Sequence, residues 1–66
     1  MNIIVNGSAQ EVPQGITVRE LIERINVKGG ACAAEVNKEL VPRRDQETRT
    51  LSEGDRVELV TLVGGG

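Results

Sequence analysis

The feature that most constrains this chain is a single helix signal placed between two groups of strand signals. Thr17 and Glu20 have the spacing of a capping box, in which each side chain accepts a hydrogen bond from the other residue's backbone N–H. The helix is expected to end near Asn26 or Val27, ahead of Gly29-Gly30. Since one apolar stripe can cover only one face of a sheet, the opposite face must meet water. The stripe consists of Val18, Leu21, Ile22 and Ile25.

Strand signals account for most of the remaining chain. Residues 1–5 alternate as a strand, and Asn6-Gly7 is typical of a type I′ turn into a returning, mostly polar edge strand at 8–12. After the helix we expect a strand at 32–37, a brief one at 48–51, and a last one from Arg56 to about Leu62. Leu40-Val41 is expected to pack back onto the core.

This order of elements predicts an α+β fold of the β-grasp (ubiquitin-like) type. The sheet would be mixed, with four to five strands, one main helix on one face, and the first strand beside the last. Sixty-six residues leave room for a single domain. We predict that this domain spans 1–63 and is followed by a flexible glycine tail at 64–66.

The composition excludes several functional classes. The net charge is −2 and there is no Phe, Tyr or Trp, so the chain offers neither a basic stripe nor stacking rings for nucleic acid. No apolar stretch is long enough to span a membrane. The lone cysteine, Cys32, fits a reducing cytoplasm and is interpreted as a buried structural residue. Without histidine or a cluster of ligands, no metal site is expected.

The C-terminal residues Gly64, Gly65 and Gly66 directly follow the last strand. Glycine has no side chain, so such a tail can enter a narrow channel and present its terminal carboxylate inside. We therefore take the carboxylate of Gly66 as the candidate functional group. The alternative is an incidental flexible end.

Apolar residues gather near this tail on the face that the helix does not cover. Alternation along the last strand assigns Val57 and Leu59 to the core. An exposed apolar group in this position is typical of a partner surface, although isolated exposed valines and leucines are common. The predicted partner-binding residues are Val60, Leu62, Val63 and Ile4.

The sequence lacks the residues of an independent enzyme, and no catalytic residue is predicted. The glycine tail has no Lys and Ser/Thr of a nucleotide loop, and the charges of Arg43-Arg44-Asp45 are those of a solvated loop at 42–47. A carboxylate becomes reactive once a partner joins it to AMP at the expense of ATP. A nucleophile can then displace AMP. The chain thus has the properties of a carrier on which partner enzymes act.

The chain resembles the ThiS family of sulfur carrier proteins along its whole length. The resemblance lies in Asn6-Gly7, the helix entry at 15–21, the Val41-Pro42-Arg43 stretch, the turn at 53–55, and the end at 63–66. It implies that an E1-like enzyme adenylates Gly66, that a sulfur-donating enzyme converts it to a thiocarboxylate, and that thiazole synthase receives the sulfur. Residues 44–47 depart from the family in lacking an aromatic side chain, which leaves any partner contact there open.

Other readings of the residues stay open at this point. A carrier could serve another pathway, as the molybdopterin synthase small subunit or a tRNA-thiolation modifier, and a plain β-grasp interaction domain needs no carrier chemistry. For the favoured reading we expect a cytoplasmic protein that is monomeric when free. It would bind no cofactor itself, while its activating partner uses ATP.

Overall fold

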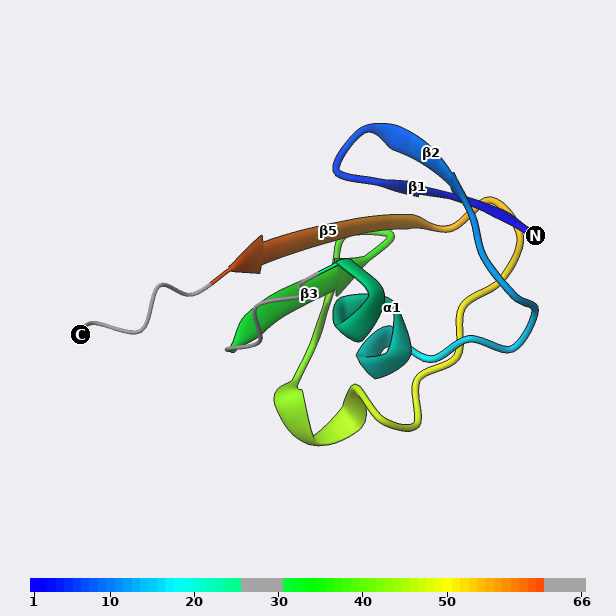
Figure 1. The fold of residues 1–66 in the computed structure, drawn as a ribbon. Coiled ribbons are helices and arrows are strands. Elements are labelled where there is room, and N and C mark those ends of the chain that lie inside the picture. Colours follow the sequence, from blue (N-terminus) through cyan, green and yellow to red (C-terminus); the bar gives the residue numbers. More distant parts are fainter. Residues whose placement is uncertain (26–30, 62–66) are drawn as a thin grey trace.

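The computed structural model describes residues 1–25 and 31–61 of the chain. A five-stranded sheet has the order β2-β1-β5-β3-β4, with α1 against one face (Figure 1). Only β1 and β5 run parallel, while the other neighbours in this sheet are antiparallel. The predicted α+β architecture, with a mixed sheet and the first strand beside the last, is confirmed. The elements are β1 (Asn2–Val5), β2 (Ser8–Glu11), α1 (Val18–Ile25), β3 (Cys32–Val36), β4 (Glu39–Val41), the 3-10 helix η1 (Arg43–Asp45) and β5 (Arg56–Thr61).

The first hairpin forms as its sequence predicts. Asn6 and Gly7 both have positive φ, at 49° and 84°, which is the conformation that a type I′ turn demands of its two central residues. Val5 lies opposite Ser8 across this turn. All residues of β2 are exposed, and the strand lies at the sheet edge, as expected.

The core lies between α1 and the sheet. Alternation in β1 buries Ile3 and Val5, and the helix stripe buries its first three members. The prediction for Ile25 was wrong, because its side chain is 43% exposed. Ile25 is the last described residue of α1. The buried apolar residues are Ile3, Val5, Val12, Ile16, Val18, Leu21, Ile22, Ala34, Val36, Val41, Leu51 and Val57.

The capping box is present at the start of α1. The Thr17 N–H donates to Glu20 Oε1 at 2.9 Å, and the Glu20 N–H donates to Thr17 Oγ1 at 3.1 Å. Two of the backbone donors at the helix start are thereby satisfied. The predicted helix end at Asn26 or Val27, and the cap at Gly29-Gly30, lie outside the described residues.

Replacing Thr17 with Ala should destabilise the fold without touching the core. Loss of the cap hydroxyl costs about 1 kcal/mol of unfolding free energy. Urea unfolding at equilibrium should show this loss at an unchanged slope, since the same surface is exposed on unfolding. Thr17→Ser keeps the hydroxyl and should remain close to wild type. Equal losses in the two variants would show that the methyl group matters, not the cap.

The segment from β4 to β5 differs from its prediction at Leu40, in the strand β4 itself, which was not expected, and in the strand expected at 48–51. Val41 is buried as expected, but Leu40 is 67% exposed, because successive side chains in β4 point to opposite faces of the sheet. The polar loop contains the short helix η1 at residues 43–45. The brief strand predicted at 48–51 is reduced to one bridge between Thr17 and Thr50, and Leu51 is buried.

Candidate functional site

The strand that leads to the C-terminus is the central strand of the sheet. β5 lies between β1 and β3, so it is paired on both sides, and its described part ends at Thr61. The candidate residues Leu62, Val63 and Gly64–Gly66 lie outside the described residues. The proposed carboxylate site and the division into 1–63 and 64–66 therefore stay predictions.

The side chains of β5 alternate between the two faces as predicted. Val57 is 1% exposed, and the half-buried Leu59 packs against the core. Val60 points to the uncovered face and is 59% exposed. The core assignments and the exposure of Val60 are thus confirmed, while its contact with a partner stays a prediction.

The apolar surface beside Val60 differs in membership from the predicted one. Val60 lies directly opposite Ala33 on β3, and Ala33 lines a mainly apolar hollow of about 220 Å³ together with Leu40. We call Val60, Ala33 and Leu40 the open-face patch. Leu40 was missed because it was expected in the core, although the alternation of β4 with Val41 inward would have placed it here.

Ile4 shares this face but does not lie beside Val60. The parallel register pairs Ile4 with Arg56, which is four residues before Val60. At 3.3 Å per residue, the two positions are about 13 Å apart along β5. Because of this distance, Ile4 is not part of the open-face patch.

Two glutamates border the open-face patch. Glu35 on β3 and Glu58 on β5 are directly opposite each other, and both are exposed. Like charges in this relation repel one another. Lys38 and Arg56 line the same shallow hollow as the two glutamates. Charges of both signs therefore lie beside the apolar side chains of this face.

Cys32 does not have the properties of a nucleophile. It lies on the core side of β3, is half-buried, and packs against the core. Burial raises the pKa of its thiol above the ordinary value, and a hydrogen bond from the Val60 backbone opposes that rise more weakly. A raised pKa leaves little thiolate at neutral pH. The prediction that Cys32 is a buried structural residue is therefore confirmed only in part, because its side chain packs against the core but is only half-buried.

Gln46 is a residue whose role the sequence did not indicate. It is 5% exposed, and its Nε2 donates to the Cys32 carbonyl at 3.1 Å. The backbone carbonyl of Gln46 accepts a hydrogen bond from the Arg19 N–H at 2.9 Å. Gln46 therefore ties the loop after η1 to both β3 and α1. No local signal distinguishes it from the exposed charges of Arg43, Arg44 and Asp45 beside it.

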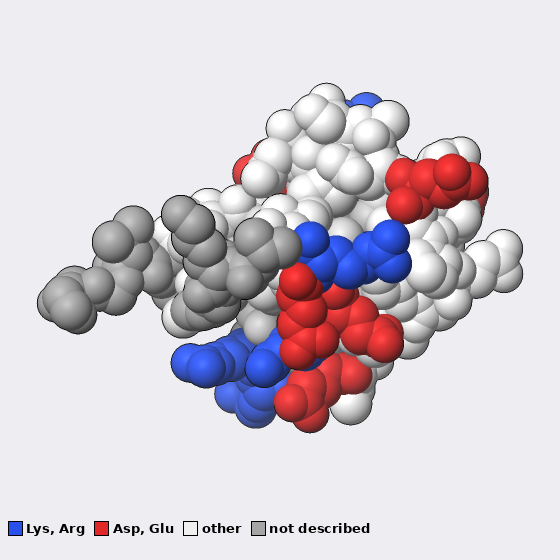
Figure 2. All heavy atoms as spheres, in the orientation of Figure 1, with Lys and Arg blue, Asp and Glu red and all other residues white. Residues whose placement is uncertain are grey.

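Charges of both signs lie next to each other on the face seen in Figure 2. Acidic and basic side chains gather over α1 and the nearby loop, while the surface over the first hairpin is mostly uncharged. This face offers no broad basic track for a phosphate backbone. The described residues contain no cluster of His, Cys, Asp or Glu suited to a metal ion. They also contain no helix of the length and apolar character that crossing a membrane requires.

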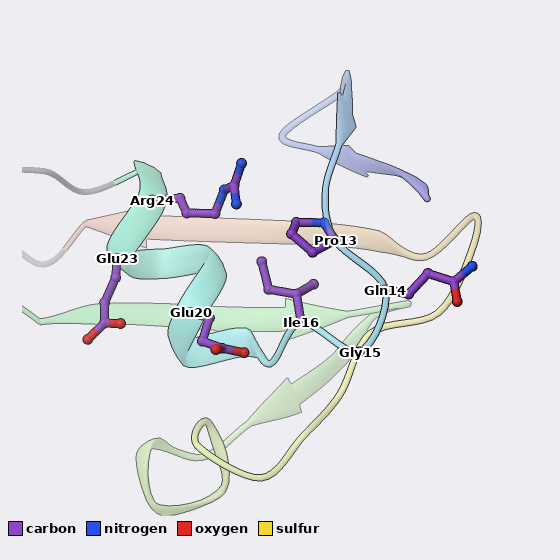
Figure 3. Close-up of a pocket in the computed structure, with 7 residues that line it drawn as sticks. All are labelled: Pro13, Gln14, Gly15, Ile16, Glu20, Glu23 and Arg24. Atoms are coloured by element: carbon purple, nitrogen blue, oxygen red, sulfur yellow. The ribbon is translucent and has the colours of Figure 1, made fainter.

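A hollow of about 460 Å³ lies between the loop at residues 13–16 and α1 (Figure 3). Arg24 extends toward Pro13 at its upper side, whereas Glu20 and Glu23 point downward and Gln14 points away. The carboxylate of Glu20 is engaged in the capping box, so it is not available to a ligand. The hollow lies on the helix side of the sheet, opposite the open-face patch, and lacks convergent polar groups. It is not a candidate active site.

The whole length of the chain is similar in sequence to known proteins. It is 30% identical to the sulfur carrier protein ThiS of Escherichia coli, with both chains covered completely. It is also 30% identical to a thiazole synthase of Paramagnetospirillum magneticum, although it spans only 20% of that protein. The crystal structure of the thiamine biosynthesis protein ThiS from Geobacter metallireducens superposes with a TM-score of 0.81 at 32% identity, again over all of both chains.

The pattern of the ThiS family matches residues 3–66, and so includes the three terminal glycines. The β-grasp assignment is confirmed by the likeness to the Geobacter protein, and the resemblance noted in the sequence is confirmed by the family match. From its third residue to its last, the chain belongs to the ThiS family of sulfur carrier proteins.

Proposed function

We propose that this chain carries sulfur for the thiazole ring of thiamine, bound as a thiocarboxylate at Gly66. The observation that carries the proposal is the extent of the family match, which includes the C-terminal glycines through residue 66. The complete mutual coverage with the Escherichia coli carrier supports the same reading. Catalysis is then supplied by partners.

The chemistry needs two steps at the terminal carboxylate. In the first, a carboxylate oxygen of Gly66 attacks the α-phosphorus of ATP, which expels pyrophosphate and forms an acyl-adenylate. In the second, sulfur at the oxidation level of sulfide attacks the carbonyl carbon and expels AMP, and a proton is released. The product is a thiocarboxylate, and no electrons are transferred overall. An E1-like enzyme would use ATP for the first step, and a sulfur-donating enzyme would supply the second.

The fold supports delivery of this carboxylate into a partner. β5 is the central strand and pairs with β3 up to Thr61, so the C-terminal residues continue from a strand that is held in the sheet. The open-face patch lies near the described end of that strand, where an enzyme that receives the tail would make contact. A partner with an apolar surface could cover Val60, Ala33 and Leu40.

Thiazole synthase is the proposed recipient of the sulfur. In Paramagnetospirillum magneticum, the matched segment makes up 20% of a protein named thiazole synthase, so a ThiS-like segment and the rest of that protein share one polypeptide. Covalent linkage keeps two partners at a high effective concentration. We propose the same partnership for the present chain, in the cytoplasm, where ATP is available.

Mass spectrometry of the protein isolated from its own cells tests the proposal. A fraction of the intact chains should carry one sulfur in place of one oxygen, and fragmentation should place the exchange on Gly66. Incubation with its adenylating enzyme, ATP and sulfide should increase that fraction. If the terminal carboxylate stays unmodified under these conditions, the carrier function is refuted. The pathway has its own test, which is growth of cells that lack the protein. If the thiocarboxylate forms but those cells grow without added thiamine, the thiamine pathway is refuted and the carrier function is not.

A further inference from the structure

The side chain of Asn6 holds β5 beyond the end of β1. The Leu59 N–H donates to Asn6 Oδ1 at 2.9 Å, and Asn6 Nδ2 donates to the Leu59 carbonyl at 3.3 Å. The preceding contacts between these strands are made by backbone alone, from the Ile4 N–H to the Asp55 carbonyl and from the Asn6 N–H to the Val57 carbonyl, both at 2.9 Å. Because the chain turns away at Asn6, its carboxamide takes the place of the next peptide group of β1.

This contact is the last one on its side of β5 among the residues that the structure describes. On the opposite side, β3 pairs with β5 up to Thr61, through Val60 with Ala33 and Thr61 with Cys32. On the β1 side, strand pairing stops at Val57. Without the carboxamide, the final residues of β5 would be held along one edge only.

We propose that Asn6 is a positioning residue for the activation of Gly66, a role that rests on the proposed function. Its carboxamide fixes the end of β5 and hence the point from which the C-terminal residues continue. The five residues after Thr61 can span no more than about 18 Å. If the end of β5 shifts away from the partner, these five residues bring the carboxylate less close to the α-phosphate of ATP.

Asn37 provides a matched control at the other end of the same strand. It too has positive φ, at 51°, and lies in a turn. Its Oδ1 accepts from the Arg56 N–H at 3.0 Å, and its Nδ2 donates to Asp55 Oδ1 at 3.0 Å. Asn37 thus secures the first residue of β5 by the same kind of contact, five residues before Thr61.

Asn6→Gly and Asn37→Gly remove the two carboxamides in the same way. Glycine adopts positive φ readily, so neither change introduces backbone strain. Amide hydrogen exchange tests the structural part without any partner. In Asn6→Gly the Leu59 amide should exchange faster than in wild type, while in Asn37→Gly the Arg56 amide should do so and Leu59 should not. Unchanged exchange at Leu59 in Asn6→Gly would overturn the inference.

Adenylation kinetics test the positioning role. With this chain as substrate of its adenylating enzyme, Asn6→Gly should lower kcat by about tenfold or more, since small displacements of a reacting group have effects of this order. KM should stay unchanged, because the open-face patch is intact. Asn37→Gly should retain the wild-type kcat.

The outcomes separate this inference from the function on which it rests. Equal kcat losses in the two variants, or none in either, would show that Asn6 is only structural. A wild-type chain that is not adenylated would refute the proposed function and the positioning role with it. Exchange at Leu59 would then still report whether Asn6 holds the strand.

Discussion

Deleting Gly66 should abolish activation of the chain while leaving its fold intact. The deletion moves the terminal carboxylate back by one residue, or about 3.5 Å. Reacting atoms must approach to about 3–3.5 Å, and a misplacement of 1 Å can cost about 100-fold in rate. ATP–pyrophosphate exchange catalysed by the adenylating enzyme should therefore fall by at least about 100-fold relative to wild type.

The unfolding free energy of the deletion variant and a second variant, Gly66→Ala, show whether the loss of activation comes from the position of the carboxylate. The buried core lies between Ile3 and Val57, so the unfolding free energy of the deletion variant should change by no more than about 0.5 kcal/mol. Gly66→Ala keeps the carboxylate in register but adds a methyl group. It should also be activated poorly if the partner's channel admits only bare backbone. Full exchange activity in the deletion variant would show that the carboxylate of Gly66 is not the activated group.

Replacing Val60 with Asp should weaken partner binding strongly at a small cost in stability. Val60 is 59% exposed, so the charge stays in contact with water in the free protein. In a complex that covers Val60, the lost burial of the exposed part of its side chain is worth about 1–2 kcal/mol. This predicts a Kd about 5- to 30-fold higher for the adenylating enzyme, measured by calorimetry. Nearby Glu58 would add to the unfavourable charge if the partner is not basic there.

Val57→Asp is the contrasting change on the same strand. Val57 is 1% exposed and faces the helix, so a carboxylate there would be buried without a partner. That penalty amounts to several kcal/mol, and a domain of this size rarely has more than about 3–5 kcal/mol in all. Val57→Asp should therefore be unfolded by circular dichroism, whereas Val60→Asp should remain folded. Unfolding of Val60→Asp, with tight binding retained by Val60→Thr, would place residue 60 in the core instead of at an interface.

Features that depend on near neighbours in the chain were determined by the sequence alone. The capping box needs only residues three apart, and the type I′ turn needs only a pair that tolerates positive φ, as Asn6 and Gly7 do. Alternation likewise identified Val57 as buried and Val60 as exposed. The order of the helix and strand signals predicted the β-grasp fold, and the glycine tail indicated a carrier. The family resemblance added sulfur as what is carried, because its motifs extend over the whole chain.

What the tertiary structure alone decided depends on contacts between residues far apart in the sequence. Register placed Ile4 beside Arg56 instead of Val60, and it set Glu35 against Glu58. Folding also turned Gln46 inward to the Cys32 carbonyl and Asn6 onto the backbone of Leu59, which is 53 residues away. The period of a strand tells which face a side chain occupies, but not which residue of another strand lies next to it. That choice is made only when the helix and sheet pack together, because the register that buries the shared core also fixes every pair on the open face.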